Sequence, residues 1–351
     1  MAALAPGGLS VNFARVLVIA EAGVNHNGDL EVAKRLVVAA KECGADAVKF
    51  QTFRAEEVAS PQAGLAEYQA RNGSLPSRSQ QELLRRLELS RTDHFELARF
   101  ARQQGVLFFS SPFDRASADL LGRVGVPMFK LGSGELTNFP LLQHVARKQK
   151  PVIVSTGMAT LAEVARAVRA IRGEGNEDIV LMHCVTQYPA PFAEVNLRAM
   201  QTMASSFHLP VGYSDHTEGN EVALAAVALG ACSIEKHFTL SRAMPGPDHQ
   251  ASQEPPEFKA LVEGIRRVER ALGDGVKRPA ACELKNKLLV RRSLFAAEEI
   301  LAGQQLTEAM LACRRPGTGI PAEQFDQLLG RTVSRRFAVG EMLDWCGLGP
   351  E

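Results

Sequence analysis

Two lysines, Lys49 and Lys130, stand within short apolar segments of the sequence, where a charged side chain needs an anionic partner. A buried ammonium group without one costs several kcal/mol. Hydroxyl groups and a glycine-rich turn follow similar segments, and such donors bind phosphate and carboxylate oxygens. We therefore predict a site for a small ligand that carries phosphate and carboxylate. The alternative is that each lysine lies at the surface or pairs with Glu21 or Glu135. The additional donors are Ser111, Ser133 and the Gly132-Ser133-Gly134 turn.

Two histidines, His216 and His237, end the last two apolar segments of this kind. If these segments are neighbouring strands, both imidazoles can bind one divalent cation. Two histidines with water or substrate oxygen suit Mn²⁺ first, with Mg²⁺ or Co²⁺ as alternatives, rather than a closed structural zinc site. Histidines that are only hydrogen-bonded are the other interpretation, and we apply it to His94 and His183.

Glutamates stand near both groups. Glu21 ends the first apolar segment, and Glu235 shares a strand face with His237, because residues two apart in a strand point the same way. By the same rule, Gln51 lies on the face of Lys49. The two glutamates are candidates for proton transfer or for binding a substrate hydroxyl, and simple salt bridges are the alternative.

The elements that must position these groups alternate between short apolar and longer amphipathic segments from about residue 15 to about residue 273. This order predicts an α/β fold, a closed (β/α)₈ TIM barrel rather than an open sheet, since neither a Rossmann glycine fingerprint nor a Walker loop is present. Reactive groups of such barrels stand at the carboxyl ends of strands, where the residues above fall. We expect strands at 16–20, 46–51, 106–110, 128–132, 152–155, 179–184, 211–214 and 232–237, and helices at 30–43, 93–104, 114–123, 140–147, 161–172, 194–207, 220–229 and 256–272.

The chain divides into a barrel over 1–273, a linker over 274–292 and a small β-rich domain over 293–351. The polar stretch 52–89 is expected to be a long loop on the catalytic face of the barrel. Ser90 and Asp93 predict a capping box at the start of the helix that follows.

The composition excludes several classes of protein. Of the 351 residues, 46% are hydrophobic, and Lys+Arg 40 against Asp+Glu 39 gives no global basic surface for nucleic acid or membrane. No apolar run is long enough to span a bilayer. The six cysteines are far apart, which is typical of reduced thiols in a cytoplasmic protein.

These segments resemble the N-acetylneuraminate (sialic acid) synthase family, which includes the legionaminic and pseudaminic acid synthases. The resemblance covers nearly the whole chain, and the tail around Arg314-Arg315-Pro316-Gly317 is similar to the family's antifreeze-like (SAF) domain. It implies a transferase that condenses phosphoenolpyruvate with N-acetylmannosamine, or a related N-acylated hexose, and water, giving N-acetylneuraminate or a related nonulosonic acid and phosphate. The resemblance rests on IAE (19–21), NH (25–26), AVKFQ (47–51), FKLGSGE (129–135), STGM (155–158), GYSDHT (212–217) and EKHF (235–238).

The resemblance also implies roles. The metal polarises the sugar aldehyde for attack by phosphoenolpyruvate, and the resulting centre takes water and expels phosphate. Glu21 and Glu235 manage the water and the proton transfers. Phosphoenolpyruvate binds Lys49, Ser111, Lys130, Ser133 and Ser214, and the metal binds His216 and His237. The sugar contacts Gln51, Tyr188 and Asp248. Arg315 reaches the N-acyl group of the sugar from the other chain of a domain-swapped homodimer.

Three other functions stay open. One is a legionaminic acid synthase that uses 2,4-diacetamido-2,4,6-trideoxymannose. The others are a class I aldolase, with a Schiff base on Lys49 or Lys130, and a non-catalytic sugar-acid-binding protein. Two departures from the family bear on the sugar: Thr186 stands where some members carry Asn, and 289–291 lacks an aromatic residue. Residues 194–198 and Tyr213 favour the sialic or legionaminic branches over the pseudaminic branch.

Overall fold

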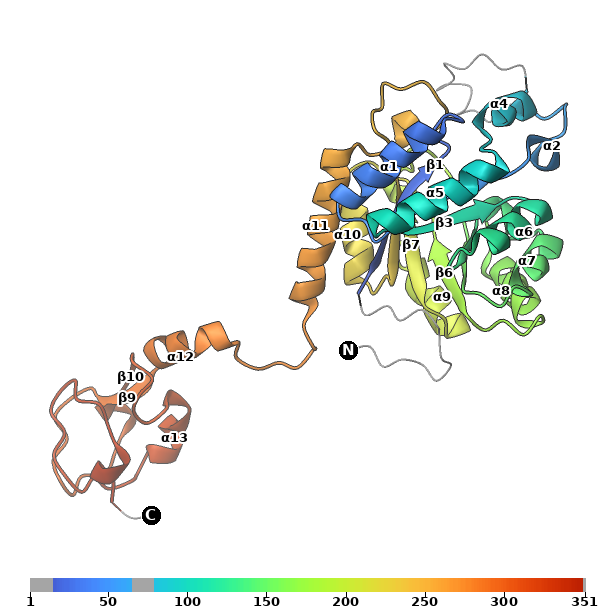
Figure 1. Cartoon of the computed structure of the whole chain (residues 1–351). Coiled ribbons are helices and arrows are strands. Elements are labelled where there is room, and N and C mark those ends of the chain that lie inside the picture. Colours follow the sequence, from blue (N-terminus) through green and yellow to red (C-terminus); the bar gives the residue numbers. More distant parts are fainter. Residues whose placement is uncertain (1–14, 65–78, 350–351) are drawn as a thin grey trace. The chain divides into compact units, whose positions relative to one another are not determined.

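The computed structural model of this chain describes residues 15–64 and 79–349 (Figure 1). The chain divides into two compact units, Met1–Asp274 and Gly275–Glu351. Each unit has its own cluster of buried apolar side chains. The first unit contains a sheet of eight parallel strands and the second a small antiparallel pair, which confirms the predicted fold class.

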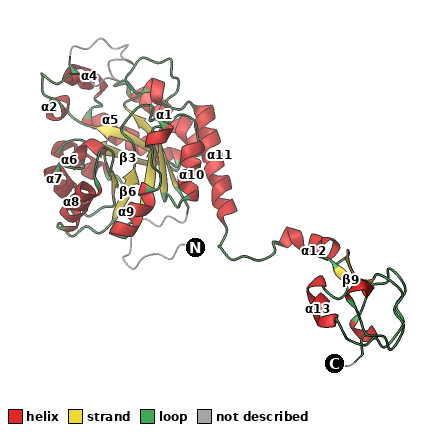
Figure 2. Cartoon of the chain, turned by 180° about the vertical axis from the view of Figure 1, so that it is seen from behind, coloured by secondary structure: helices red, strands yellow, loops and turns green. Residues whose placement is uncertain are grey.

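The eight strands of the first unit form a near-closed barrel. Hydrogen bonds join them in the order β3-β2-β1-β8-β7-β6-β5-β4, and the two end strands, β3 and β4, contact each other. Figure 2 shows these strands inside a layer of helices. Consecutive strands are therefore neighbours, as a barrel of strand–helix units requires. The strands are β1 (Leu17–Gly23), β2 (Ala47–Thr52), β3 (Leu107–Pro112), β4 (Phe129–Leu131), β5 (Val152–Ser155), β6 (Ile179–His183), β7 (Val211–Asp215) and β8 (Ser233–His237).

Each strand is followed by a helix that packs its apolar face on the barrel. In α8, for example, Val164, Val168 and Ile171 are buried at the spacing of one helix face. The predicted capping box at the start of α5 is confirmed, because Ser90 and Asp93 each accept the other's backbone N–H. These helices are α1 (Leu30–Glu42), α5 (Arg91–Gln104), α6 (Arg115–Val124), α7 (Phe139–Ala146), α8 (Leu161–Arg172), α9 (Ala199–Phe207), α10 (Glu221–Ala228) and α11 (Pro255–Leu272).

The stretch 52–89, predicted to be a long loop, contains helices in its described part. They are α2 (Ala55–Val58) and α4 (Gln80–Leu87). Residues 65–78, also part of the predicted loop, lie outside the described residues. The loop prediction is wrong for α4 because Leu83 and Leu87, one turn apart, bury a helix face against apolar residues that follow β1 and β2.

Helix α9 begins five residues later than predicted. A 3₁₀ turn, Phe192–Glu194, occupies the predicted start, and Asn196 then adopts a left-handed backbone with φ of 50°. That conformation cannot continue a right-handed helix. The segment 194–198 is therefore a turn at the carboxyl end of the barrel rather than part of the outer layer.

The second unit is built around a short antiparallel pair, β9 (Ser293–Ala296) and β10 (Leu311–Arg314). Isolated bridges and one short helix, α13 (Phe325–Leu328), complete it around a core that includes Leu294 and Phe337. The stretch 274–292 contains a 3₁₀ turn, Ala281–Glu283, and the helix α12 (Leu284–Val290). Within 15–64 and 79–349, no helix has the length and apolar character needed to cross a membrane.

Candidate active site

The first group of site residues lies where β1, β2 and β3 run side by side. Glu21 of β1 is the register partner of Lys49 of β2, and the Lys49 ammonium lies 2.8 Å from a Glu21 carboxylate oxygen. Lys49 also donates to Ser111 Oγ on β3 at 3.2 Å, and Gln51 Nε2 donates to the other Glu21 oxygen at 3.2 Å. All four side chains thus meet at the carboxyl end of the barrel, as predicted from their place in the strands.

The second group comes from the other side of the ring. One oxygen of Glu235, Oε1, accepts from Lys130 Nζ and from Ser214 Oγ, each at 3.2 Å, and lies 3.7 Å from Lys49 Nζ. This oxygen joins the two lysines into one buried cluster. The pairing of lysines with glutamates, left open by the sequence, is therefore present, although Lys130 pairs with Glu235 and not with Glu135. The second oxygen, Oε2, is buried and has no hydrogen-bond partner among the described residues.

The cluster separates the protonation states of its two carboxyl groups. Burial raises the pKa of Glu21 to about 7, despite the opposing effect of Lys49. Burial acts in the same direction on Glu235, but Lys130 and Lys49 outweigh it and lower the pKa of Glu235. Burial by itself would lower the pKa of Lys49. The neighbouring carboxylates of Glu21 and Glu235 outweigh burial and raise this pKa. One carboxyl able to hold a proton beside one that stays ionised is an arrangement suited to acid–base chemistry.

The two histidines predicted to bind metal lie side by side at the ends of β7 and β8, with ring centroids 5.5 Å apart. His216 Nδ1 contacts the Val185 carbonyl oxygen at 2.6 Å, and its Nε2 lies 3.4 Å from Ser214 Oγ. His237 Nδ1 is buried and has no hydrogen-bond partner in the described part of the chain. A buried ring nitrogen that lacks a hydrogen-bond partner is explained if that nitrogen coordinates a cation.

The protonation of these histidines also suits a cation. Burial lowers the pKa of both imidazoles, that of His237 to about 3, so both rings are neutral near pH 7. Neutral imidazole is the form that binds metals. No set of three His, Cys, Asp or Glu side chains within 15–64 and 79–349 is arranged to hold a metal ion. Two neutral imidazoles side by side fit a divalent cation whose other ligands are water or substrate oxygens.

The histidines interpreted as structural are hydrogen-bonded in the interior. His94 bonds to Thr52 Oγ1 at 2.9 Å and to the Ser90 carbonyl oxygen at 2.8 Å. His183 Nε2 bonds to the Val195 carbonyl oxygen at 2.7 Å. Both rings have partners that explain their burial without a ligand.

Two of the predicted sugar contacts lie beside these groups. The Tyr188 ring lies 4.3 Å from the His216 ring and 5.4 Å from the His237 ring, centroid to centroid. Asp248 is half-buried after β8, and burial raises its pKa to about 6 while Lys49 acts in the opposite direction. Lys49 is therefore close enough to affect the pKa of Asp248, so both side chains belong to the same end of the barrel.

Ser133 belongs to a contact group that the sequence did not indicate. Ser133 Oγ accepts from the Gly157 backbone N–H at 3.0 Å and lies 3.1 Å from Cys184 Sγ. A Cβ at position 157 would stand only 2.2 Å from Thr186 Oγ1. Cys184 is buried and contacts this candidate ligand-binding serine. The Ser155-Thr156-Gly157 strand end is the signal that could have indicated this group.

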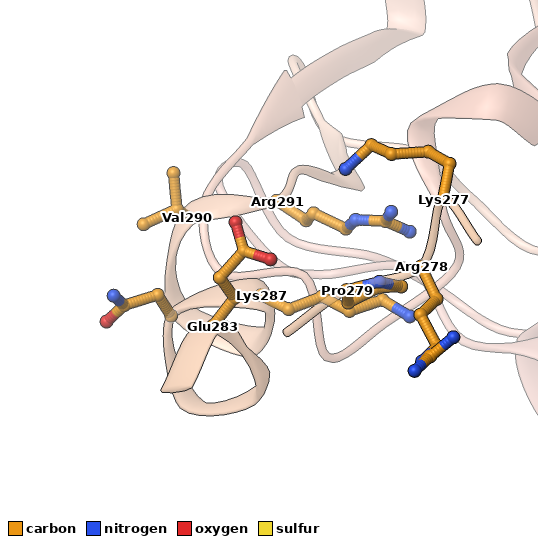
Figure 3. A pocket seen from close by; sticks show the side chains of 8 residues that line it. Lys277, Arg278, Pro279, Glu283, Lys287, Val290 and Arg291 are labelled. Atoms are coloured by element: carbon orange, nitrogen blue, oxygen red, sulfur yellow. The ribbon is translucent and has the colours of Figure 1, made fainter. Parts of the chain in front are cut away.

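Arg315, predicted to reach the N-acyl group of the sugar, belongs to the second unit. Its Nε donates at 3.0 Å to the carbonyl oxygen of Val290, which is the last residue of α12. Val290 and Arg291, from the stretch that lacks the aromatic residue, line a cavity of about 520 Å³ (Figure 3). The charged side chains that line the cavity with them are Lys277, Arg278, Lys287 and Glu283.

Comparisons with known proteins identify the family of the chain. Residues 36–277 match the NeuB family, and residues 291–348 match the SAF domain. An N,N'-diacetyllegionaminic acid synthase of Legionella pneumophila is 48% identical over 332 residues, which are 93% of this chain and 93% of the relative. The enzyme of the same name from Campylobacter jejuni is 46% identical over 331 residues, 94% of this chain and 99% of the relative.

A solved structure gives the same result. The crystal structure of an N-acetylneuraminic acid (sialic acid) synthetase from Leptospira borgpetersenii matches with a TM-score of 0.69 at 34% identity, over 78% of this chain and 90% of that one. The resemblance inferred from the sequence is thereby confirmed. The chain belongs to the NeuB family of phosphoenolpyruvate-dependent nonulosonic acid synthases, which are transferases, and it carries a C-terminal SAF domain.

Proposed function

We propose that this protein condenses phosphoenolpyruvate with 2,4-diacetamido-2,4,6-trideoxymannose and water, giving N,N'-diacetyllegionaminic acid and phosphate. The observation that carries the proposal is the buried cluster of two lysines and two glutamates beside a pair of neutral histidines. It combines cationic groups for a dianionic substrate with a cation site for an aldehyde oxygen. The choice of sugar is supported by the names of the relatives at 46% and 48% identity.

Phosphoenolpyruvate takes the cationic part of the site in this proposal. Its phosphate and carboxylate supply the anions that Lys49 and Lys130 otherwise find in Glu21 and Glu235. Hydroxyl groups already directed at this cluster or close to it add hydrogen bonds. They belong to Ser111, Ser133 and Ser214.

The sugar takes the side of the histidines. His216 and His237 hold a divalent cation, Mn²⁺ first, and when bound this cation polarises the sugar aldehyde. Tyr188 packs against both rings and thereby orients the sugar next to them. Asp248 and Gln51, whose amide also bonds to Glu21, provide polar contacts to the sugar.

The reaction forms one carbon–carbon bond and breaks one bond to phosphate. The methylene carbon of phosphoenolpyruvate attacks the aldehyde carbon, water adds to the carbon that bears the phosphate, and phosphate leaves. The attacking water loses both of its protons: one balances the proton taken up by the aldehyde oxygen, and the other leaves the new hydroxyl as the carbonyl forms and goes to the departing phosphate. Glu21, which can hold a proton near neutral pH, and Glu235, which stays ionised, are the donor and acceptor in reach of the lysine-bound substrate.

A second acceptor is N-acetylmannosamine, which gives N-acetylneuraminate. The Leptospira structure, at 34% identity, carries the name of that synthase. The relatives with the legionaminic name are more similar and cover the chain more fully, so they favour the alternative stated from the sequence over its first expectation. The two sugars share the aldehyde end and differ at carbons 4 and 6. The same set of catalytic side chains serves both.

The decisive experiment measures phosphate release from phosphoenolpyruvate with Mn²⁺ and either sugar, each with and without EDTA. We expect release with the diacetamido sugar, much weaker release with N-acetylmannosamine, and none in EDTA. Faster release with N-acetylmannosamine would transfer the assignment to the sialic branch. Release that EDTA leaves unchanged would exclude the metal role, as would unchanged turnover of His237→Ala.

The class I aldolase interpretation makes the opposite predictions. It requires a neutral lysine amine, whereas the carboxylate neighbours of Lys49 raise its pKa and keep it charged; burial lowers the pKa of Lys130 despite its ion pair with Glu235, so Lys130 is the lysine that this interpretation must use. A Schiff base would allow borohydride to trap the diacetamido sugar on Lys49 or Lys130, with no effect of EDTA. A protein that only binds sugar acids would release no phosphate with either sugar.

We also propose that Arg315 acts on the N-acyl group in the site of a partner chain, so that barrel 1–273 and domain 293–351 cooperate across a swapped homodimer joined by 274–292. Mixing Arg315→Ala chains with Lys49→Met chains tests this. Each parent should be nearly inactive, and the mixture should recover activity because some sites then combine an intact barrel with an intact Arg315. No recovery in a mixture that exchanges subunits would exclude the swap.

A further inference from the structure

Lys236 and Asp215 form an ion pair that the catalytic proposal does not use. Their Nζ and Oδ2 atoms are 2.6 Å apart, and both side chains are almost completely buried, with exposed fractions of 4% and 0%. Lys236 lines a cavity of about 770 Å³ together with Pro256 and Ala260 of α11. The same cavity is lined by His216 and Thr217, so the pair lies on the side of the strands that faces α11 and borders the candidate metal ligand His216.

The pair stands between two pairs of site residues on the same two strands. Ser214 and Glu235 are register partners and hydrogen-bonded inside the barrel, and Asp215 and Lys236 are the next register partners. His216 and His237 follow immediately. Because successive strand residues point to opposite faces, an outward pair lies between two inward pairs.

Every N–H of the Lys236 ammonium has an acceptor. Besides Asp215 it donates to the carbonyl oxygens of Thr217 and Gly219, each at 2.8 Å. The other oxygen of Asp215 accepts the backbone N–H of Thr217 at 2.9 Å and its hydroxyl at 2.7 Å. The chain from Asp215 to Gly219 is thus folded around one ammonium group, and His216 lies within that fold.

We propose that the Lys236–Asp215 pair is a positioning device that holds His216 and His237 at the spacing needed to share one divalent cation. Lys236 precedes His237, and Asp215 precedes His216, so the ion pair couples the backbones that carry the two imidazoles. His216 is fixed on both sides, by Asp215 before it and Thr217 after it. The inference rests on the metal site of the proposed function and extends it to residues behind that site.

Stability alone is a weak reason for such a pair. Two buried charges lose hydration, and apolar residues of similar size often replace a buried ion pair without loss of stability. Groups that support metal ligands from behind, in contrast, commonly change metal affinity about 10- to 100-fold when they are replaced. Metal affinity is therefore the quantity that separates a positioning role from a purely structural one.

The test measures the dissociation constant of Mn²⁺ for the metal-free full-length protein, by electron paramagnetic resonance of free Mn²⁺, together with the thermal midpoint in EDTA. The variant is Lys236→Met/Asp215→Asn, which removes both charges and retains an acceptor for Thr217. The matched control is Arg266→Met/Asp46→Asn, which removes another ion pair, 2.5 Å long, that joins α11 to the residue before β2. A milder variant, Thr217→Val, keeps both charges and removes one hydroxyl contact.

We expect the Lys236→Met/Asp215→Asn variant to bind Mn²⁺ about tenfold or more weakly and the control to bind it like wild type, even where the control melts at a lower temperature. Thr217→Val should show a smaller loss in the same direction, and it decides the question if the double variant does not fold. Wild-type affinity in the double variant, or in Thr217→Val when that variant decides, would overturn the inference. A wild-type protein that binds no Mn²⁺ would instead overturn the metal site itself, and the inference with it.

Discussion

The ammonium group of Lys49 lies 2.8 Å from the carboxylate of Glu21, its register partner on the neighbouring strand. Each group is the anion or cation that the other needs in the interior. A dianionic substrate that enters the barrel must therefore compete with Glu21 for this lysine. Because burial raises the pKa of Glu21 to about 7, that carboxyl can take up a proton and release Lys49 to the substrate at little electrostatic cost near neutral pH.

Replacement of Lys49 by Met should reduce kcat/KM for phosphoenolpyruvate about a hundredfold or more, because it removes a preorganised cation from a buried site. The measurement is phosphate release at varied phosphoenolpyruvate with the sugar saturating. Lys34→Met on α1 is the matched control, since Lys34 pairs with Glu31 and Glu96 away from the barrel interior. An unchanged KM for phosphoenolpyruvate in Lys49→Met would remove this lysine from the substrate site.

Gly157→Ala should damage the Ser133 side of the site. The new Cβ would stand 2.2 Å from Thr186 Oγ1 and 2.8 Å from Ser133 Oγ, so these groups must move. A displacement of this size near bound substrate costs up to about a hundredfold in kcat/KM. Gly122→Ala on α6 is the control, because a Cβ there meets only the Lys148 side chain, at 3.8 Å. Equal phosphoenolpyruvate kinetics in the two variants would show that Ser133 does not hold that substrate.

The sequence predicted the barrel and most of the site because both follow from local patterns. Alternating apolar segments give eight strands, and a parallel barrel brings all their carboxyl ends together, so Glu21, Lys49 and Glu235 had to meet. Residues two apart on one strand, such as Glu235 and His237, share a face by strand geometry alone. Both the strand positions and the shared strand faces follow from the periodicity of apolar residues, which can be read from a single sequence.

Other features depend on contacts between distant residues, which periodicity does not contain. The hydrogen bond between Ser133 and Cys184 depends on how far along the barrel axis the ends of two strands lie. The pairing of Lys130 with Glu235 rather than Glu135 depends on the directions of side chains across the barrel. The turn at Asn196 depends on a left-handed backbone angle that asparagine tolerates but does not require. Each of these was decided by tertiary packing.

Lowering the pH should destabilise the barrel through buried neutral histidines. Burial lowers the pKa of His26 to about 4, whereas an unfolded histidine titrates near about 6.5. As the pH falls from about 6.5 towards 4, the unfolded chain gains a proton that folded His26 does not, so stability present above that range is lost within it. His26→Gln should therefore reduce the loss of unfolding free energy between pH 7 and pH 5 by about 2 kcal/mol.

Urea unfolding of the two proteins at both pH values measures this difference. Val37→Ala on α1 is the control, since it removes a buried apolar contact and no titratable group, and it should leave the pH dependence as in wild type. A pH dependence that His26→Gln does not reduce would assign the acid sensitivity to other groups.

Asp248→Asn should weaken binding of the sugar and spare phosphoenolpyruvate. Burial raises the pKa of Asp248 to about 6, so its carboxylate accepts hydroxyl hydrogen bonds above that pH and loses this ability as the pH falls through it. A hydrogen bond to a charged group is worth about 1.5–3 kcal/mol, which corresponds to about a 10- to 100-fold rise in the KM for the sugar. The wild-type KM for the sugar should also rise below pH 6, whereas that of the variant should not. Asp119→Asn on α6, which removes a surface carboxylate, should change neither constant. If the KM for phosphoenolpyruvate rises instead, Asp248 belongs to the part of the site that binds phosphoenolpyruvate, and other side chains must bind the sugar.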